Sequence, residues 1–149
     1  GESRIVPVLP RFLEINSALE HTVGAIELVF GHNDLLAGNF IDDGKRLWLI
    51  DWDYAGFNSP LFDLANLTSN NEFSEKQEHT LLEEYFESRT DKDLWRRYHA
   101  MKCASLLREA MWGMVSEIHS ELDFDFVKYT AENLERFEKA HTHFVENIA

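Results

Sequence analysis

Apolar residues recur every three or four positions over much of the chain, a spacing typical of helices that bury one face. Tyr85 and Ile118, for example, are expected on such buried faces. Capping residues mark where several of these helices begin. The combined pattern predicts helices over residues 11–23 and 61–69, a third opened by the capping box Ser74–Gln77, a fourth from Asp91 to about Ser120, and a last one that begins at Asp123 or Asp125.

The strands predicted by the sequence are short. Residues 25–30 favour a strand, and residues 39–41 and 46–50 flank the turn Asp42-Asp43-Gly44, which is typical of a hairpin. We expect residues 1–10 to be an irregular opening segment and residues 51–60 to be a loop. The fold class is therefore α+β and mostly helical, with residues 1–149 forming a single domain.

Composition narrows the class of protein. A chain of 149 residues with 44% hydrophobic side chains is large enough to bury a substantial core. A formal net charge of −13 argues against nucleic acid as a partner, because phosphate backbones are held by clustered Lys and Arg. No apolar run is long enough to span a bilayer, and no secretion signal opens the chain. One cysteine, Cys103, excludes an internal disulfide and suits the reducing cytoplasm, where we expect this protein.

The most informative polar residues are His32, Asp34 and Asn39, which lie between apolar segments and precede a strand-like stretch ending in Asp51. A His-x-Asp-x-x-x-x-Asn run followed by a strand-terminal Asp has the spacing of kinase-type phosphoryl transfer. In such a site the loop Asp reaches the acceptor hydroxyl, while the Asn and the second Asp hold Mg²⁺ on the phosphates. Taken singly, each of these residues fits a turn or a cap equally well. Their combination favours the catalytic interpretation.

The sequence leaves more than one role open for the polar residues near this motif. His32 fits a general base or a metal ligand, but we expect it to pack under the loop and hydrogen-bond to backbone. Asp53 lies two residues after Asp51, so a continuing strand would place both carboxylates on one face, where Asp53 would serve the metal or the substrate. A turn-capping role for Asp53 is as well supported. Asp63, near a helix start, favours a structural role.

The chain resembles the C-terminal lobe of the aminoglycoside phosphotransferase and choline/ethanolamine kinase superfamily, which has a protein-kinase-like fold. The resemblance covers nearly all of the chain. It is carried by three motifs, His32-Asn33-Asp34-Leu35 with Asn39, Ile50-Asp51-Trp52-Asp53-Tyr54, and Phe62-Asp63-Leu64-Ala65-Asn66.

This resemblance implies a role for each matching residue. Asp34 would be the catalytic base, Asn39 and Asp51 would be Mg²⁺ ligands, and Asp63 would brace the catalytic loop beside His32. The implied reaction is transfer of the γ-phosphoryl group of ATP to a hydroxyl of a small alcohol. Asn33 stands where protein kinases carry Arg, so a small-molecule kinase is favoured over a protein kinase.

The second motif resembles choline and ethanolamine kinases more than antibiotic kinases, which implies a cationic acceptor. Trp112 and Tyr129 resemble the aromatic residues that hold quaternary ammonium in choline kinases, with Tyr54 and Asp53 expected nearby. Aromatic faces attract such cations by roughly 0.5–2 kcal/mol each. Val115 departs from the family's second Trp. Packing of Trp112 and Tyr129 between two helices is an equally weighted alternative, and the acceptor stays open among choline, ethanolamine, thiamine and aminoglycosides.

The phosphate-binding half of a kinase is missing from this sequence. None of the seven glycines forms a G-x-G, and no Val-Ala-x-Lys strand precedes the motif. We therefore expect a fragment of a longer chain that lacks the N-terminal lobe and is inactive alone. Two alternatives remain: a non-catalytic binding module or degenerate kinase, and a metal-dependent hydrolase using Asp34, Asp51 and Asp53. The oligomeric state stays open, with a homodimer as one outcome.

Overall fold

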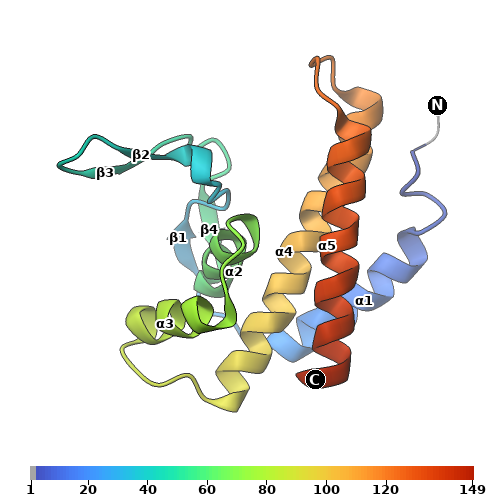
Figure 1. Ribbon diagram of the computed structural model, residues 1–149. Coiled ribbons are helices and arrows are strands. Elements are labelled where there is room, and N and C mark those ends of the chain that lie inside the picture. Colours follow the sequence, from blue (N-terminus) through green and yellow to red (C-terminus); the bar gives the residue numbers. More distant parts are fainter. Residues whose placement is uncertain (1–2) are drawn as a thin grey trace.

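The computed structural model describes residues 3–149 and shows a helical body with a small strand region on one side (Figure 1). This confirms the mostly helical α+β class. The elements in chain order are α1 (Leu9–Val23), β1 (Val29–Gly31), the 3₁₀ turn η1 (Ala37–Asn39), β2 (Phe40–Asp42), β3 (Leu47–Leu49), β4 (Gly56–Asn58), α2 (Pro60–Asn70), α3 (Glu75–Phe86), α4 (Lys92–His119) and α5 (Phe126–Asn147).

The helical body is built on α4 and α5, which lie side by side along most of their length, with α1 against α4 (Figure 1). Phe12 of α1 and Phe137 of α5 meet edge to face, with ring centroids 5.9 Å apart, inside the buried core. Helices α4 and α5 approach closely at Gly113, where an added Cβ would lie 2.5 Å from Thr130 Oγ1. Glycine is therefore required there for the two helices to touch.

A second buried cluster joins α2 and α3 to the first half of α4. Leu82 of α3 and Tyr98 of α4 are fully buried in it, and Met101 packs against both clusters. The helix starts follow the predicted caps: the Ser74–Gln77 capping box opens α3, and the Asp91 side chain accepts the N–H of Leu94 at the start of α4. This packing fixes α2 against α4, and side chains of both helices hold the loop of the candidate site.

The strands form two separate antiparallel pairs, β1 with β4 and β2 with β3. The predicted hairpin around residues 42–44 is confirmed as β2–β3. The prediction of a strand over residues 25–30 is wrong in extent, because only Val29–Gly31 finds a partner, in Gly56–Asn58. Residues 56–58 were expected to be loop, since three residues containing Gly and Asn carry little strand signal. The β1–β4 pair is not a hairpin, so one hairpin and one long-range pair flank the loop.

Several helix predictions need correction. Helix α1 begins inside the segment expected to be irregular, at Leu9, with Pro10 in its first turn, where a missing N–H does no harm. The last helix is capped by Asp125, not Asp123. Tyr85 is 49% exposed and Ile118 is 37% exposed, so neither is buried. None of the helices within residues 3–149 combines the length and the hydropathy that crossing a membrane demands.

Candidate functional site

The polar loop predicted from the sequence runs from the end of β1 to β2, and Asp63 in the first turn of α2 holds its beginning. The two carboxylate oxygens of Asp63 accept the backbone N–H groups of His32 and Asn33, each at 2.7 Å. This contact needs a glycine at position 31, because an added Cβ there would lie 2.8 Å from Asp63 Oδ2. The loop backbone is thus fastened to the start of α2.

His32 is buried and connects the loop to the strand that precedes Asp51. Its Nδ1 accepts the N–H of Asp34 at 3.2 Å, and its Nε2 lies 2.8 Å from the carbonyl oxygen of Ile50. A backbone N–H can only donate, so Nδ1 carries no proton and Nε2–H donates to Ile50. Both ring nitrogens are occupied in a neutral imidazole. The ring therefore contacts backbone on both sides and has no nitrogen left for a metal or a substrate.

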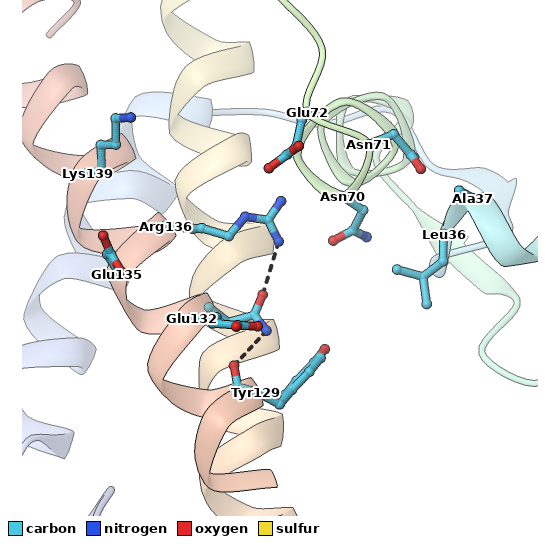
Figure 2. Close-up of a pocket in the computed structure, with 11 residues that line it drawn as sticks. Leu36, Ala37, Asn70, Asn71, Glu72, Tyr129, Glu132, Glu135, Arg136 and Lys139 are labelled. Atoms are coloured by element: carbon cyan, nitrogen blue, oxygen red, sulfur yellow. Dashed lines mark hydrogen bonds between the residues drawn. The ribbon is translucent and has the colours of Figure 1, made fainter. Parts of the chain in front are cut away.

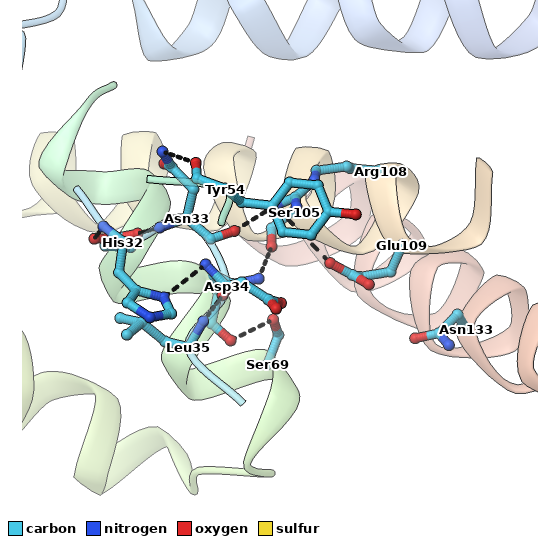
Figure 3. A network of polar contacts seen from close by, with 12 residues as sticks. His32, Asn33, Asp34, Leu35, Tyr54, Ser69, Ser105, Arg108, Glu109 and Asn133 are labelled. Atoms are coloured by element: carbon cyan, nitrogen blue, oxygen red, sulfur yellow. Dashed lines mark hydrogen bonds and ion pairs between the residues drawn. The ribbon is translucent and has the colours of Figure 1, made fainter. Parts of the chain in front are cut away.

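The rest of the loop backbone is held by side chains of α2 and α4 (Figure 3). Asn66 Oδ1 accepts the N–H of Leu35 at 2.6 Å, and the Asn66 amide is itself oriented by Ser105 of α4. Arg108 of α4 donates to the carbonyl oxygen of Asn33 at 2.6 Å. With these bonds the backbone N–H groups of residues 32–35 all have partners, so the loop has one well-defined conformation.

Asn33 has a left-handed backbone, with φ of 64°. Asparagine tolerates this region better than most residues. Its side-chain amide donates to the carbonyl oxygen of Tyr54 at 3.1 Å, and its Oδ1 accepts from the Asn58 side chain, also at 3.1 Å. The position that carries Arg in protein kinases is used here to tie the loop to the segment after Asp51.

Asn39 and Asp51 are brought next to the loop by backbone pairing. The carbonyl oxygen of Asn39 accepts the N–H of Ile50 at 2.9 Å, and the Asn39 side-chain amide donates to the carbonyl oxygen of Asp34 at 2.8 Å. Among residues 3–149 no donor contacts Asn39 Oδ1 or the Asp51 carboxylate. These are oxygen ligands of the kind that Mg²⁺ binds when substrate phosphates and water complete its shell. The donor set therefore fits Mg²⁺.

The alternative of a metal site made only of protein side chains such as carboxylates can be tested on the described residues. Within the described part of the chain, no three His, Cys, Asp or Glu side chains come together as a metal-binding group. Asp34, Asp51 and Asp53 therefore do not form the carboxylate cluster that the hydrolase alternative requires.

The Asp34 carboxyl lies in the loop close to charges of both signs. Burial raises its pKa above the ordinary value, and the negative charge of Asp51 adds to the rise, whereas the guanidinium of Arg108 opposes it. A raised pKa makes a carboxylate a better proton acceptor, provided that the working pH stays above it. This environment suits a general base.

Asp34 opens into a cavity of about 90 Å³ between the loop, α4 and α5, lined by Asp34, Leu36, Tyr54, Arg108, Glu109, Trp112 and Tyr129. The structure thus brings together four residues that were predicted from four separate segments of the sequence: Asp34, Tyr54, Trp112 and Tyr129. Asp53 is exposed and does not line this cavity.

Aromatic rings form the outer wall of the cavity. Trp112 and Tyr129 meet edge to face with centroids 5.5 Å apart, and Phe124 and Phe126 extend the cluster. Tyr129 O–H donates to Glu109 Oε2 at 2.7 Å. Burial and the adjacent Glu109 raise the pKa of Tyr129, so it keeps its proton and remains a donor. Trp112 and Tyr129 pack α4 against α5 and also line the cavity, so both sequence-based alternatives describe part of their environment.

Sequence reasoning missed several residues of the site. Asn66 was recognised only as part of a motif, and Arg108 gave no signal because it lies 74 positions after Asp34 in a helix without any local motif. An Arg beside a Glu near Trp112 was the only available hint. Contacts of this range follow from how α4 crosses the loop, which residue spacing does not reveal.

A wider cavity of about 900 Å³ adjoins the small one, between residues 36–37, residues 70–72 and α5 (Figure 2). Its α5 wall is polar: Arg136 donates to Asn133 Oδ1 at 3.3 Å, and the Asn133 amide donates to the carbonyl oxygen of Tyr129 at 2.9 Å. Leu36 and Tyr129 line both cavities, which therefore meet at these two side chains.

Comparison with known proteins gives consistent matches. The sequence model of the family described as choline/ethanolamine kinase matches residues 11–95. Protein LicA of Haemophilus influenzae is 29% identical over 108 residues, which cover 70% of this chain and 40% of that protein. A probable ethanolamine kinase of Arabidopsis thaliana is 28% identical over 123 residues, which cover 68% of this chain and 32% of that protein.

Comparison with solved structures also finds a choline/ethanolamine kinase family protein. The crystal structure of a choline/ethanolamine kinase family protein from Mesorhizobium loti superposes with a TM-score of 0.76 at 28% identity, covering 90% of this chain and 45% of the other. The chain thus spans less than half the length of each of these relatives.

Proposed function

Because the chain belongs to the choline/ethanolamine kinase family, we propose that it forms the catalytic lobe of an ATP-dependent phosphotransferase that phosphorylates a small cationic alcohol. The observation that carries this proposal is the cavity of about 90 Å³, in which Asp34 shares one small space with Glu109, Trp112 and Tyr129. A base for a hydroxyl and an anionic, aromatic wall for an ammonium group are the two features that an amino alcohol requires.

In this proposal Asp34 accepts the proton of the acceptor hydroxyl. The hydroxyl oxygen forms a bond to the γ-phosphorus of ATP while the bond from that phosphorus to the β–γ bridging oxygen breaks, and ADP leaves with the electron pair. Asp63, His32, Asn66 and Arg108 hold the loop so that Asp34 needs no reorganisation during the transfer.

Asn39 and Asp51 are the residues that would hold Mg²⁺, through Asn39 Oδ1 and the Asp51 carboxylate. Bound Mg²⁺ supplies positive charge that neutralises the phosphates. The Asn39 side chain is already oriented by its bond to the carbonyl oxygen of Asp34, so the metal ligand and the base are fixed relative to each other. Both positions belong to one backbone unit joined by the Asn39–Ile50 hydrogen bond.

The test uses the full-length protein that contains this chain, with Mg²⁺-ATP and a panel of choline, ethanolamine, thiamine and aminoglycosides. We expect ADP release that depends on one of the amino alcohols. Asp34→Asn should lower kcat by roughly 10²–10⁴, the range for removing a positioned base, with an unchanged melting temperature. Asp123→Asn, an exposed aspartate near α5, is the matched control. Turnover near the wild-type level in a folded Asp34→Asn protein would remove Asp34 from the mechanism.

A further inference from the structure

We propose that Glu109 makes the small cavity select acceptors whose ammonium group carries N–H bonds, primary amines above all, over quaternary ammonium. This inference rests on the proposed function and specifies its substrate class. It follows from one carboxylate oxygen in the cavity that lacks a hydrogen-bond partner.

Glu109 is a buried anion with half of its hydrogen-bonding capacity unused. It is 7% exposed, and its Oε2 accepts the Tyr129 O–H at 2.7 Å. Within residues 3–149 no donor contacts Oε1, and the nearest cationic atom is Arg108 Nη1 at 4.0 Å. Oε1 keeps contact with solvent in the cavity, and a carboxylate oxygen that gives up water to a ligand needs compensation by charge and by hydrogen bonds. A ligand ammonium in the cavity would provide both.

Arg108 provides only part of that compensation, because it forms an ion pair with Glu109 at 4.0 Å without a hydrogen bond. Its Nη1 donates to the carbonyl oxygen of Asn33 at 2.6 Å, and its guanidinium lies over the rings of Tyr54 and Phe62 at 5.4 and 5.3 Å from their centroids. Turning toward Glu109 would release the catalytic loop. The arrangement therefore keeps Glu109 Oε1 available to the acceptor.

Hydrogen bonding to Glu109 distinguishes a primary from a quaternary ammonium group, whereas the aromatic rings do not. The faces of Trp112 and Tyr129 attract a primary and a quaternary cation alike. A carboxylate, in contrast, gains a charge-assisted hydrogen bond only from a cation that has an N–H.

The experiment separates hydrogen bonding from size with a methylation series. Full-length enzyme is assayed at saturating Mg²⁺-ATP with ethanolamine, its N-methyl and N,N-dimethyl derivatives, and choline, and kcat/KM is compared. Each step adds one methyl group, but only the last removes the final N–H. We expect kcat/KM to fall along the series, with the largest fall, about tenfold, at that last step.

Glu109→Gln should reduce that last step, because the bond from an ammonium N–H to a neutral amide oxygen is weaker than the bond to a carboxylate. Glu121→Gln, an exposed glutamate beyond the end of α4, should leave the series as in the wild type. If Glu109→Gln does not fold, Tyr129→Phe, which keeps the ring but removes the O–H that orients Glu109, should reduce the step about threefold. A wild-type enzyme that prefers choline, or a step unchanged in Glu109→Gln, would overturn the inference while leaving the kinase function standing. Failure to phosphorylate any member would overturn the proposed function itself.

Discussion

Replacing Asp63 by asparagine tests whether the catalytic loop depends on a carboxylate in α2. Asp63 receives two backbone N–H groups, from His32 and Asn33, at 2.7 Å each. The substitution preserves the shape of the side chain but replaces one acceptor oxygen by an NH₂ group, which faces a backbone donor. One hydrogen bond becomes neutral and the other is lost.

The magnitude follows from these contacts. Hydrogen bonds to charged groups contribute about 1.5–3 kcal/mol, neutral ones about 0.5–1.5 kcal/mol, and a buried donor left without a partner costs about 1–3 kcal/mol. Asp63 also lies in the first turn of α2, where its charge adds about 0.3–1 kcal/mol. We therefore expect Asp63→Asn to lower the free energy of unfolding by about 2–4 kcal/mol, or the melting temperature by about 5–15 °C.

The assay is urea unfolding of the full-length protein, followed by kcat under conditions in which the variant is folded. We expect kcat to fall as well, since Asp34 is positioned by the backbone that Asp63 holds. Asp53→Asn, an exposed aspartate nearby, serves as the control and should change the unfolding free energy by less than about 0.5 kcal/mol. An Asp63→Asn protein with wild-type stability and wild-type kcat would refute the reasoning that these two hydrogen bonds fix the loop.

Two further predictions concern α4. Arg108→Gln removes the positive charge that lowers the pKa of Asp34, so that pKa should rise. Because the base must be deprotonated, activity should then be lost at a higher pH as the pH falls, and the acid limb of the kcat profile should move to higher pH. Arg108→Lys keeps the charge and should leave the acid limb near the wild-type position. Gly113→Ala places a Cβ 2.5 Å from Thr130 Oγ1 and should destabilise the protein by about 1–3 kcal/mol in urea unfolding, while Gly38→Ala, with no atom within 4 Å of the added Cβ, should not produce such a clash.

The parts of the fold that the sequence predicted are those encoded locally. Helix starts at Asp91 and at the Ser74–Gln77 capping box were predicted correctly, because a cap is a contact between residues two or three positions apart. The β1–β4 pair was missed because its two strands lie more than twenty residues apart and contain three residues each. Such a strand exists only through its partner, which no local pattern reveals.

The residues of the candidate site also divide into those that a local sequence pattern predicts and those that depend on long-range packing. Asp34, Asn39 and Asp51 were predicted because one loop and one hairpin fix their spacing. Trp112 and Tyr129 were predicted from resemblance alone, and their place beside Asp34 depends on how α4 and α5 cross the loop. Arg108 was not predicted at all. It acts through a backbone carbonyl, and almost any sequence offers such an oxygen, so nothing in the chain marks its partner.

The distribution of hydrogen bonds in the site indicates what it binds. The backbone N–H groups of residues 32–35 all have partners, which gives the preorganised framework that a catalytic site needs. Three oxygen acceptors of the site, in contrast, have no hydrogen-bond donor among residues 3–149: Asn39 Oδ1, the Asp51 carboxylate and Glu109 Oε1. Acceptors of this kind can exchange water for ligands that bring positive charge or N–H groups. Under the proposed function, a divalent cation at Asn39 and Asp51 and an ammonium group at Glu109 would satisfy all three.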